Sequence, residues 1–141
     1  MQTFSFRVAL VLGLAAPACG GDDTVGSSNL LTGTYQATLF VVTPTGQAPI
    51  DVLAAGGSLS ISIAASGATS GTLSLPASVT GGAALSESMA GTASITALTV
   101  HFTQDADTFV RDLTWLRVGT ALTVVDQPAG AATFSISLAH Q

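Results

Sequence analysis

The chain has 141 residues, of which 48% are hydrophobic and only 8% are charged, with three basic against eight acidic side chains. This composition excludes intrinsic disorder, which needs low hydrophobicity and high charge, and the length suits a single domain. A formal net charge of -5, without a cluster of basic residues, excludes nucleic acid as a partner.

The N-terminal segment has the layout of a secretory signal peptide. Arg7 supplies a positive charge near the start, and an apolar run over residues 8–18 closes on small residues. Eleven apolar residues are too few to cross a hydrocarbon core of about 30 Å as a helix. We therefore expect residues 1–18 to be an export signal and not a permanent membrane span.

Cys19 follows this segment and is the only cysteine of the chain. Residues 14–19, Leu-Ala-Ala-Pro-Ala-Cys, resemble the lipobox of bacterial lipoproteins, which implies cleavage before Cys19 and attachment of palmitate-type acyl chains to its thiol. The same residues fit the A-x-A site of the ordinary signal peptidase, which would release a soluble protein. We favour lipidation, because a lone cysteine has no disulfide partner and stands where the lipid would be added.

A tether connects this cysteine to the rest of the chain. Residues 20–29 are rich in glycine, serine and aspartate, which is typical of a flexible linker. Two or more acyl chains hold a protein stably on a membrane, whereas one binds only marginally. Residues 19–29 are therefore expected to be a lipidated tether in the cell envelope, with the outer membrane favoured because glycine, not aspartate, follows Cys19. A soluble periplasmic or secreted protein is the alternative.

Beyond the tether, apolar residues recur with period two in segments rich in Val, Ile, Thr and Phe, the pattern of half-buried β-strands. The segment from Ser58 to Ile63 is the clearest case, with aliphatic side chains on one face and serines on the other. No convincing helix is found, and residues 50–53 could add a short extra strand. Eight strands are expected, at residues 34–43, 57–64, 68–75, 86–96, 98–104, 108–118, 120–126 and 131–139.

Antiparallel strands joined by short turns can close into a barrel, which removes the edges of the sheet. We therefore expect residues 30–141 to form one all-β domain, an antiparallel up-and-down barrel of about eight strands, with a β-sandwich as the alternative. Strand count and order resemble those of lipocalin-like, or calycin-like, barrels. Residues 31–35, Leu-Thr-Gly-Thr-Tyr, resemble that family's Gly-x-Trp motif, with Tyr35 in place of the tryptophan. In that family an arginine of the last strand tends to cover this aromatic side chain, whereas the last segment here contains no arginine.

The barrel interior should come from one face of each strand, although a packed core and a ligand cavity give the same sequence pattern. Small residues at Ala37, Gly91 and Ala93 leave space that tighter closure or a ligand could fill. The expected inward residues are Leu39, Val41, Leu59, Ile61, Ile63, Leu73, Leu75, Met89, Ile95, Phe102, Leu122, Val124, Phe134, Ile136 and Leu138.

The chain offers little for catalysis. His101 lies between two apolar residues of one strand and should point outward, and His140 should be frayed at the C-terminal end. Asp105 and Asp107 lack the spacing and the closing glutamate of a calcium loop, and fit a turn stabilised by side-chain to backbone hydrogen bonds. We therefore expect no enzymatic activity, no metal and no cofactor.

Residues 108–118 form the least regular of the expected strands. If Phe109 and Trp115 face inward, Arg111 does too, and it needs a partner such as the anionic head of an amphiphile. The opposite alternation leaves Trp115 at the surface and Arg111 in solvent, while a bulge could reconcile both halves and put Arg111 at the barrel mouth. Phe109, Arg111 and Trp115 are therefore the candidate ligand-binding residues.

The sequence thus predicts a monomeric, non-enzymatic, lipid-anchored domain of the cell envelope whose partner is the membrane. In the sharper form of this prediction, the barrel binds a small apolar or amphiphilic ligand, as the lipocalin-like resemblance implies. The alternative is a packed structural or protein-interaction module of the envelope with no small-molecule ligand.

Overall fold

The computed structural model describes residues 31–141 and shows an all-β chain with almost no helix. The expected signal peptide, the lipidated Cys19 and its tether lie outside the described residues. One short helix, α1 (Ala77–Thr80), and one 3-10 turn, η2 (Phe109–Arg111), interrupt the strands. The strands are β1 (Gly33–Pro44), β2 (Ile50–Asp51), β3 (Ser58–Ile63), β4 (Ala68–Leu75), β5 (Leu85–Ser88), β6 (Gly91–Ile95), β7 (Thr99–Gln104), β8 (Trp115–Val118), β9 (Ala121–Ala129) and β10 (Ala132–His140).

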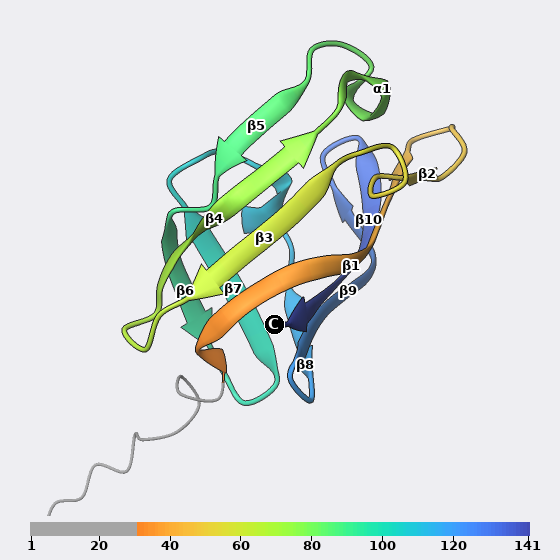
Figure 1. The fold of residues 1–141 in the computed structure, drawn as a ribbon. Helices are drawn as coiled ribbons and strands as arrows, with labels where there is room; N and C mark the ends of the chain where they lie inside the picture. Colours follow the sequence, from red (N-terminus) through yellow and green to blue (C-terminus); the bar gives the residue numbers. More distant parts are fainter. Residues whose placement is uncertain (1–30) are drawn as a thin grey trace, which may run out of the picture.

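The strands close into one antiparallel barrel, which confirms the expected fold over the sandwich. Eight strands follow one another around the wall, and β1 pairs with β10 to seal it (Figure 1). Each strand of this ring pairs with the strands before and after it in the ring, the up-and-down order that short connections favour. The two other strands lie off the ring, since β2 pairs with β1 and β5 pairs with β4.

The antiparallel order gives the barrel two distinct ends. The C-terminal ends of β1, β4, β7 and β9 share one end, the upper end, where α1 and β2 also lie (Figure 1). The opposite, lower end carries the first described residue, Leu31, and the last residue, Gln141 (Figure 1). The chain therefore enters and leaves the barrel at the same end.

The single strand expected over residues 86–96 is two strands, β5 and β6. The upper half of β4 pairs with β5, whereas its first two residues pair with β6. Gly71 lies between these halves with a φ of +131°, and its carbonyl accepts a 3.0 Å hydrogen bond from the Met89 amide. A Cβ at Gly71 would collide with the Ser60 carbonyl, so glycine allows β4 to press against β3 here.

β6 and β7 form a hairpin that short ladders join to the rest of the wall. The two strands pair with each other over five positions. By contrast, two register pairs join β6 to β4, and two join β7 to β8. We call residues 91–104 the β6–β7 panel.

A bulge in β1 changes which of its side chains face the interior. The register with β10 shifts between Ala37 and Leu39, so one extra residue is inserted in β1. An inserted residue reverses the alternation beyond it. The expected inward positions Leu39 and Val41 are therefore wrong, and Phe40 and Val42 are buried instead.

The other inward predictions describe the core well, because simple alternation holds in the strands concerned. Large buried side chains fill the barrel, and each stabilises the fold by about 1.5–3 kcal/mol relative to full exposure. Ile95 is only partly buried. The confirmed interior residues are Leu59, Ile61, Ile63, Leu73, Leu75, Met89, Phe102, Leu122, Val124, Phe134, Ile136 and Leu138.

A second bulge interrupts β9 opposite β10. Asp126 adopts a φ of 47°, and its carboxylate accepts a 2.8 Å hydrogen bond from the Ser135 hydroxyl. Beyond the bulge, the Gln127 carboxamide bonds both backbone groups of Thr114, accepting from N–H at 2.9 Å and donating to C=O at 2.6 Å. This side chain thus replaces ladder pairing just before β8 begins, and it fixes the segment that follows η2.

Candidate ligand-binding site

The upper end of the barrel contains a hollow of about 320 Å³. It lies between the end of β1, helix α1 and the turn that joins β9 to β10. Gly81 ends α1 with a φ of +72°, which turns the chain back toward β5. Gln47, Ser78 and Thr80 add polar groups to a lining that is mainly apolar, from Val42, Pro44, Ile50, Val79, Ala131 and Ala132.

A group of aromatic side chains in the core is connected to this hollow through Val42. Val42 lines the hollow and pairs in register with Phe134, which faces the interior. The ring of Phe109 stacks on Phe134, with centroids 4.2 Å apart and planes inclined by 12°. The Phe40 centroid is 5.9 Å from that of Phe109. We call Phe40, Phe109 and Phe134 the aromatic group, and Phe109 is its partly buried member.

Two polar side chains near the upper end of the barrel are buried without a hydrogen-bond partner among the described residues. Gln104, at the upper end of β7, is 2% exposed, and both heteroatoms of its carboxamide are unpaired. Thr108 precedes η2, which packs against β7, and its buried hydroxyl is also unpaired. Leaving a buried polar group unpaired costs about 1–3 kcal/mol. These atoms are therefore the clearest polar anchors for a bound molecule in the described barrel.

Gln104 and Thr108 are not among the ligand-binding residues predicted from the sequence. The signal for Gln104 was present, because it continues the inward alternation of Val100 and Phe102. Thr108 follows an irregular turn, and no pattern in the sequence distinguishes it from exposed threonines.

Trp115, a candidate ligand contact, is a core residue. It is fully buried at the start of β8, and its ring meets Phe102 edge-on, with centroids 5.7 Å apart. Its Nε1 donates to the Val110 carbonyl at 3.5 Å. Trp115 thus supports the wall behind η2, and its one polar atom already has a partner.

The prediction of one strand over residues 108–118 is wrong for the first half of this segment. The turn η2 replaces it, so Val110 and Trp115 are both buried while Arg111 is exposed. Arg111 Nη1 lies 3.3 Å from Asp107 Oδ1 in an exposed ion pair, which contributes little stability. Neither regular alternation is therefore realised, and the Arg111 guanidinium lies outside the barrel.

Tyr35 fills the barrel interior near the lower end. The ring of His140 meets it edge-on at a centroid distance of 5.2 Å, and His140 Nε2 lies 3.2 Å from the Thr32 carbonyl oxygen. A Cβ at Gly33 would collide with this imidazole. The expectation that His140 is frayed is therefore wrong, because the last strand carries it over Tyr35.

The Tyr35 hydroxyl has no hydrogen-bond partner among the described residues. Burial raises the pKa of Tyr35 above its ordinary value of 10.0, and the nearby charge of Arg117 offsets part of that rise. Tyr35 therefore keeps its proton at pH values at which an exposed tyrosine begins to lose it.

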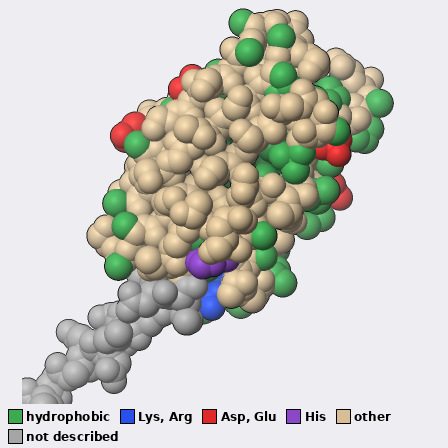
Figure 2. Space-filling view, viewed as in Figure 1, with side chains coloured by type: hydrophobic (Ala, Val, Ile, Leu, Met, Phe, Trp, Pro, Cys, Tyr) green, Lys and Arg blue, Asp and Glu red, His purple; other side chains and the backbone are tan. Residues whose placement is uncertain are grey.

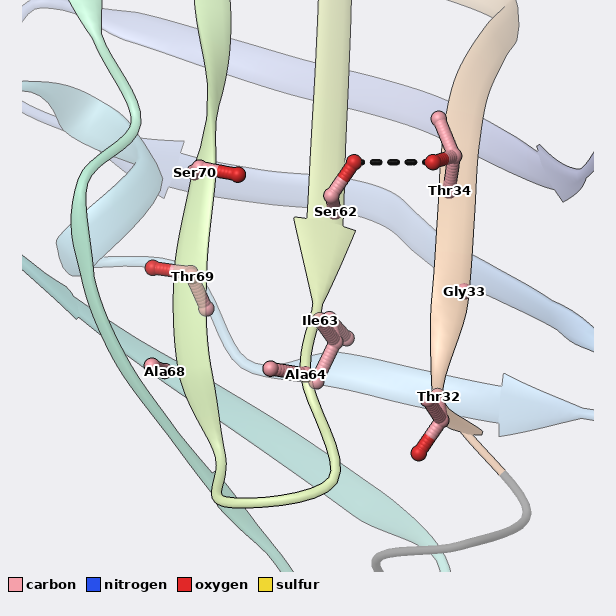
Figure 3. Close-up of a pocket in the computed structure, with 9 residues that line it drawn as sticks. All are labelled: Thr32, Gly33, Thr34, Ser62, Ile63, Ala64, Ala68, Thr69 and Ser70. Carbon is pink, nitrogen blue, oxygen red and sulfur yellow. Dashed lines mark hydrogen bonds between the residues drawn. The ribbon is translucent and has the colours of Figure 1, made fainter.

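A second hollow of about 320 Å³ lies over β1, β3 and β4 toward the lower end (Figure 3). The hydroxyls of Thr34 and Ser62 lie 2.8 Å apart in a hydrogen bond across its rim (Figure 3). The Thr69 hydroxyl donates to the Met89 carbonyl at 2.9 Å. Because these hydroxyls already have partners within the protein, the upper hollow is the stronger candidate.

The remaining titratable side chains form no evident centre. His101 is exposed on β7, as expected from its place between two buried residues. Within residues 31–141, no three His, Cys, Asp or Glu side chains gather closely enough to hold a metal ion. No helix in this part of the chain is long and apolar enough to span a membrane.

Comparison with known proteins gives no relative. No protein-family model matches the chain, and neither a curated protein nor a solved structure matches it significantly. The strand pairing alone therefore identifies the closed eight-stranded ring.

Proposed function

We propose that this protein is a non-enzymatic domain of the cell envelope that is exported, anchored by lipid on Cys19, and binds one small amphiphile in the upper half of its barrel. The observation that carries the binding proposal is the buried Gln104 carboxamide, whose donor and acceptor atoms both lack partners. An alcohol, an amide or a protonated acid could pair with both atoms.

The interior favours a neutral polar group over a charged one. Besides Tyr35, whose hydroxyl is buried, the buried polar residues of the described barrel are Thr69, Gln104 and Thr108, and none of these carries a charge. Burying an ion without a counter-charge is costly, and Arg111 lies outside on Asp107. The position of Arg111 therefore does not support the binding of an anionic headgroup inside the barrel.

The aromatic group supplies the apolar part of the proposed site. Phe109 belongs to a three-residue turn instead of a strand, so fewer backbone hydrogen bonds hold it than hold Phe134. We propose that the apolar part of the ligand lies in the upper hollow against Phe109 and that its polar group reaches toward Gln104. The likeness to lipocalin-like barrels supports this placement, through the eight-stranded ring and through His140, which covers Tyr35 from the last strand.

The site is tested by Gln104→Leu, with Gln36→Leu on the exposed face of β1 as the matched control. Native mass spectrometry of the protein purified gently from producing cells should show a lipid-sized adduct that Gln104→Leu loses and Gln36→Leu keeps. In thermal or urea unfolding without ligand, Gln104→Leu should raise stability by about 1–3 kcal/mol, because it removes an unpaired buried amide.

Two outcomes would refute the binding site. One is an adduct-free protein whose mass stays unchanged after long-chain alcohols, amides and fatty acids are added. The other is an adduct that survives Gln104→Leu undiminished. The first result would leave the packed structural or protein-interaction module, which the filled core favours, whereas the second would place the bound ligand away from Gln104.

The anchor is tested separately by mass spectrometry of the N-terminal peptide. We expect two or three acyl chains on Cys19 and loss of membrane association in Cys19→Ser. An unmodified Cys19 at the mature N-terminus would refute lipidation and favour a soluble periplasmic or secreted protein.

A further inference from the structure

Three aliphatic side chains are exposed together at the lower end of the barrel. Leu98 is 71% exposed in the turn between β6 and β7, and Leu116 and Val118 of β8 are 44% and 61% exposed. The Arg117 amide donates to the Leu98 carbonyl at 2.8 Å, so this turn lies directly beside β8. We call Leu98, Leu116 and Val118 the lower apolar patch.

Charge is distributed unevenly between the two ends. Arg117 lies between Leu116 and Val118 in β8, with its side chain on the opposite face of the strand and its charge near Tyr35, and His140 lies at the same end of the barrel. In the space-filling view, the acidic side chains in sight are on the upper part of the barrel, away from the blue and purple groups (Figure 2). The strand order places every acidic side chain of the described chain away from the lower end: Asp51, Glu87, Asp105, Asp107, Asp112 and Asp126.

The lower end is also the end at which the proposed tether joins the barrel. Leu31 is buried there, directly before β1. Twelve residue steps separate Cys19 from Leu31, and a fully extended chain of that length spans at most about 40 Å. A lipid on Cys19 would therefore keep this end closer to a bilayer than the upper end.

We propose that the lower end docks on the lipid surface, with the lower apolar patch at the level of the headgroups and Arg117 near their phosphates. This inference rests on the lipid anchor of the proposed function and adds a second, non-covalent contact to it. Exposed aliphatic side chains together with a cation bind interfaces weakly by themselves and reinforce an acyl anchor. Docked in this way, the barrel turns its upper hollow and its acidic side chains away from the membrane.

The experiment measures vesicle binding without the acyl chains. The chain from residue 19 to residue 141 contains every strand of the closed barrel, and Cys19→Ser removes the lipid site. We expect this protein to float with vesicles made of equal parts phosphatidylethanolamine and phosphatidylglycerol. Adding Leu98→Ser and Val118→Ser should lower the partition coefficient about tenfold.

The matched control carries Leu39→Ser and Val125→Ser, two aliphatic positions on the wall that are 45% and 66% exposed. These substitutions should leave the partition coefficient within about twofold of the parent. All four sites are exposed, so circular dichroism and unfolding curves should be alike in the two variants. Absence of vesicle binding by the parent, or an equal loss in both variants, would overturn the docking proposal.

Different measurements would refute the lipid anchor and the docking proposal. An unmodified Cys19 refutes the anchor but leaves the flotation result, obtained without lipid, as it stands. A lipidated Cys19 combined with equal partition of patch and control variants refutes docking alone.

Discussion

At the scale of single residues, the ionisation of Tyr35 makes the stability of the fold depend on pH. Its hydroxyl is fully buried and unpaired among the described residues, and burial raises its pKa because the phenolate would lose its hydration. The unfolded chain titrates near the ordinary value of 10.0. The folded protein therefore holds this proton at pH values at which the unfolded chain has released it.

We expect Tyr35→Phe to remove an alkaline loss of stability. The contribution of the neutral tyrosine is complete below about pH 10 and is lost as the pH rises through the folded-state pKa. Near neutral pH the variant should be as stable as the parent, or more stable by about 1 kcal/mol, since only an unpaired hydroxyl is removed.

Urea unfolding at several pH values between about 8 and 11 measures this effect. Tyr35 is the only tyrosine of the chain, so no second phenol confuses the comparison. If both proteins lose stability in parallel above about pH 10, the assignment to Tyr35 is wrong.

At the scale of elements, Gly71 allows β4 to change partners between β5 and β6. We expect Gly71→Ala to destabilise the protein by at least about 2 kcal/mol, because its backbone conformation is strained for an L-residue and its Cβ would meet the Ser60 carbonyl. Gly82→Ala is the control, since Gly82 has open space around it and no positive φ. Urea unfolding should show little change for the control, and equal losses in both variants would contradict this role of Gly71.

Alternation within single strands was enough to predict most of the core. Ile61 and Leu73 needed only the period of two, whereas Leu39 was misplaced because the β1 bulge depends on pairing with β10, far along the chain. The orientation of Arg111 stayed open at the level of the sequence, because η2 is a turn whose position depends on packing. Gln104 followed the predictable alternation, but only the structure shows that its amide lacks a partner.

At the scale of the whole molecule, the ring closes by joining the first and last of its strands. Short connections in the sequence were enough to predict the order of neighbours. Closure was harder to predict, because the same alternating strands could have formed two packed sheets. The register pairs between β1 and β10, from Tyr35 with His140 to Pro44 with Ala132, decide for the barrel.

The β6–β7 panel is held in the barrel wall by fewer strand pairs than the β1–β10 seam, because the ladders on both of its sides are short. Opening this panel breaks two register pairs on each side, whereas parting β1 from β10 breaks the long seam. Local opening occurs where the fewest contacts must be broken. We expect the Phe102 amide to exchange with deuterium at least about tenfold faster than the Ile136 amide, by native-state exchange followed by NMR. Equal exchange rates would mean that the barrel opens only as one unit. Faster exchange at Phe102 would mean that the β6–β7 panel opens by itself, and this opening would expose Gln104 to solvent without global unfolding.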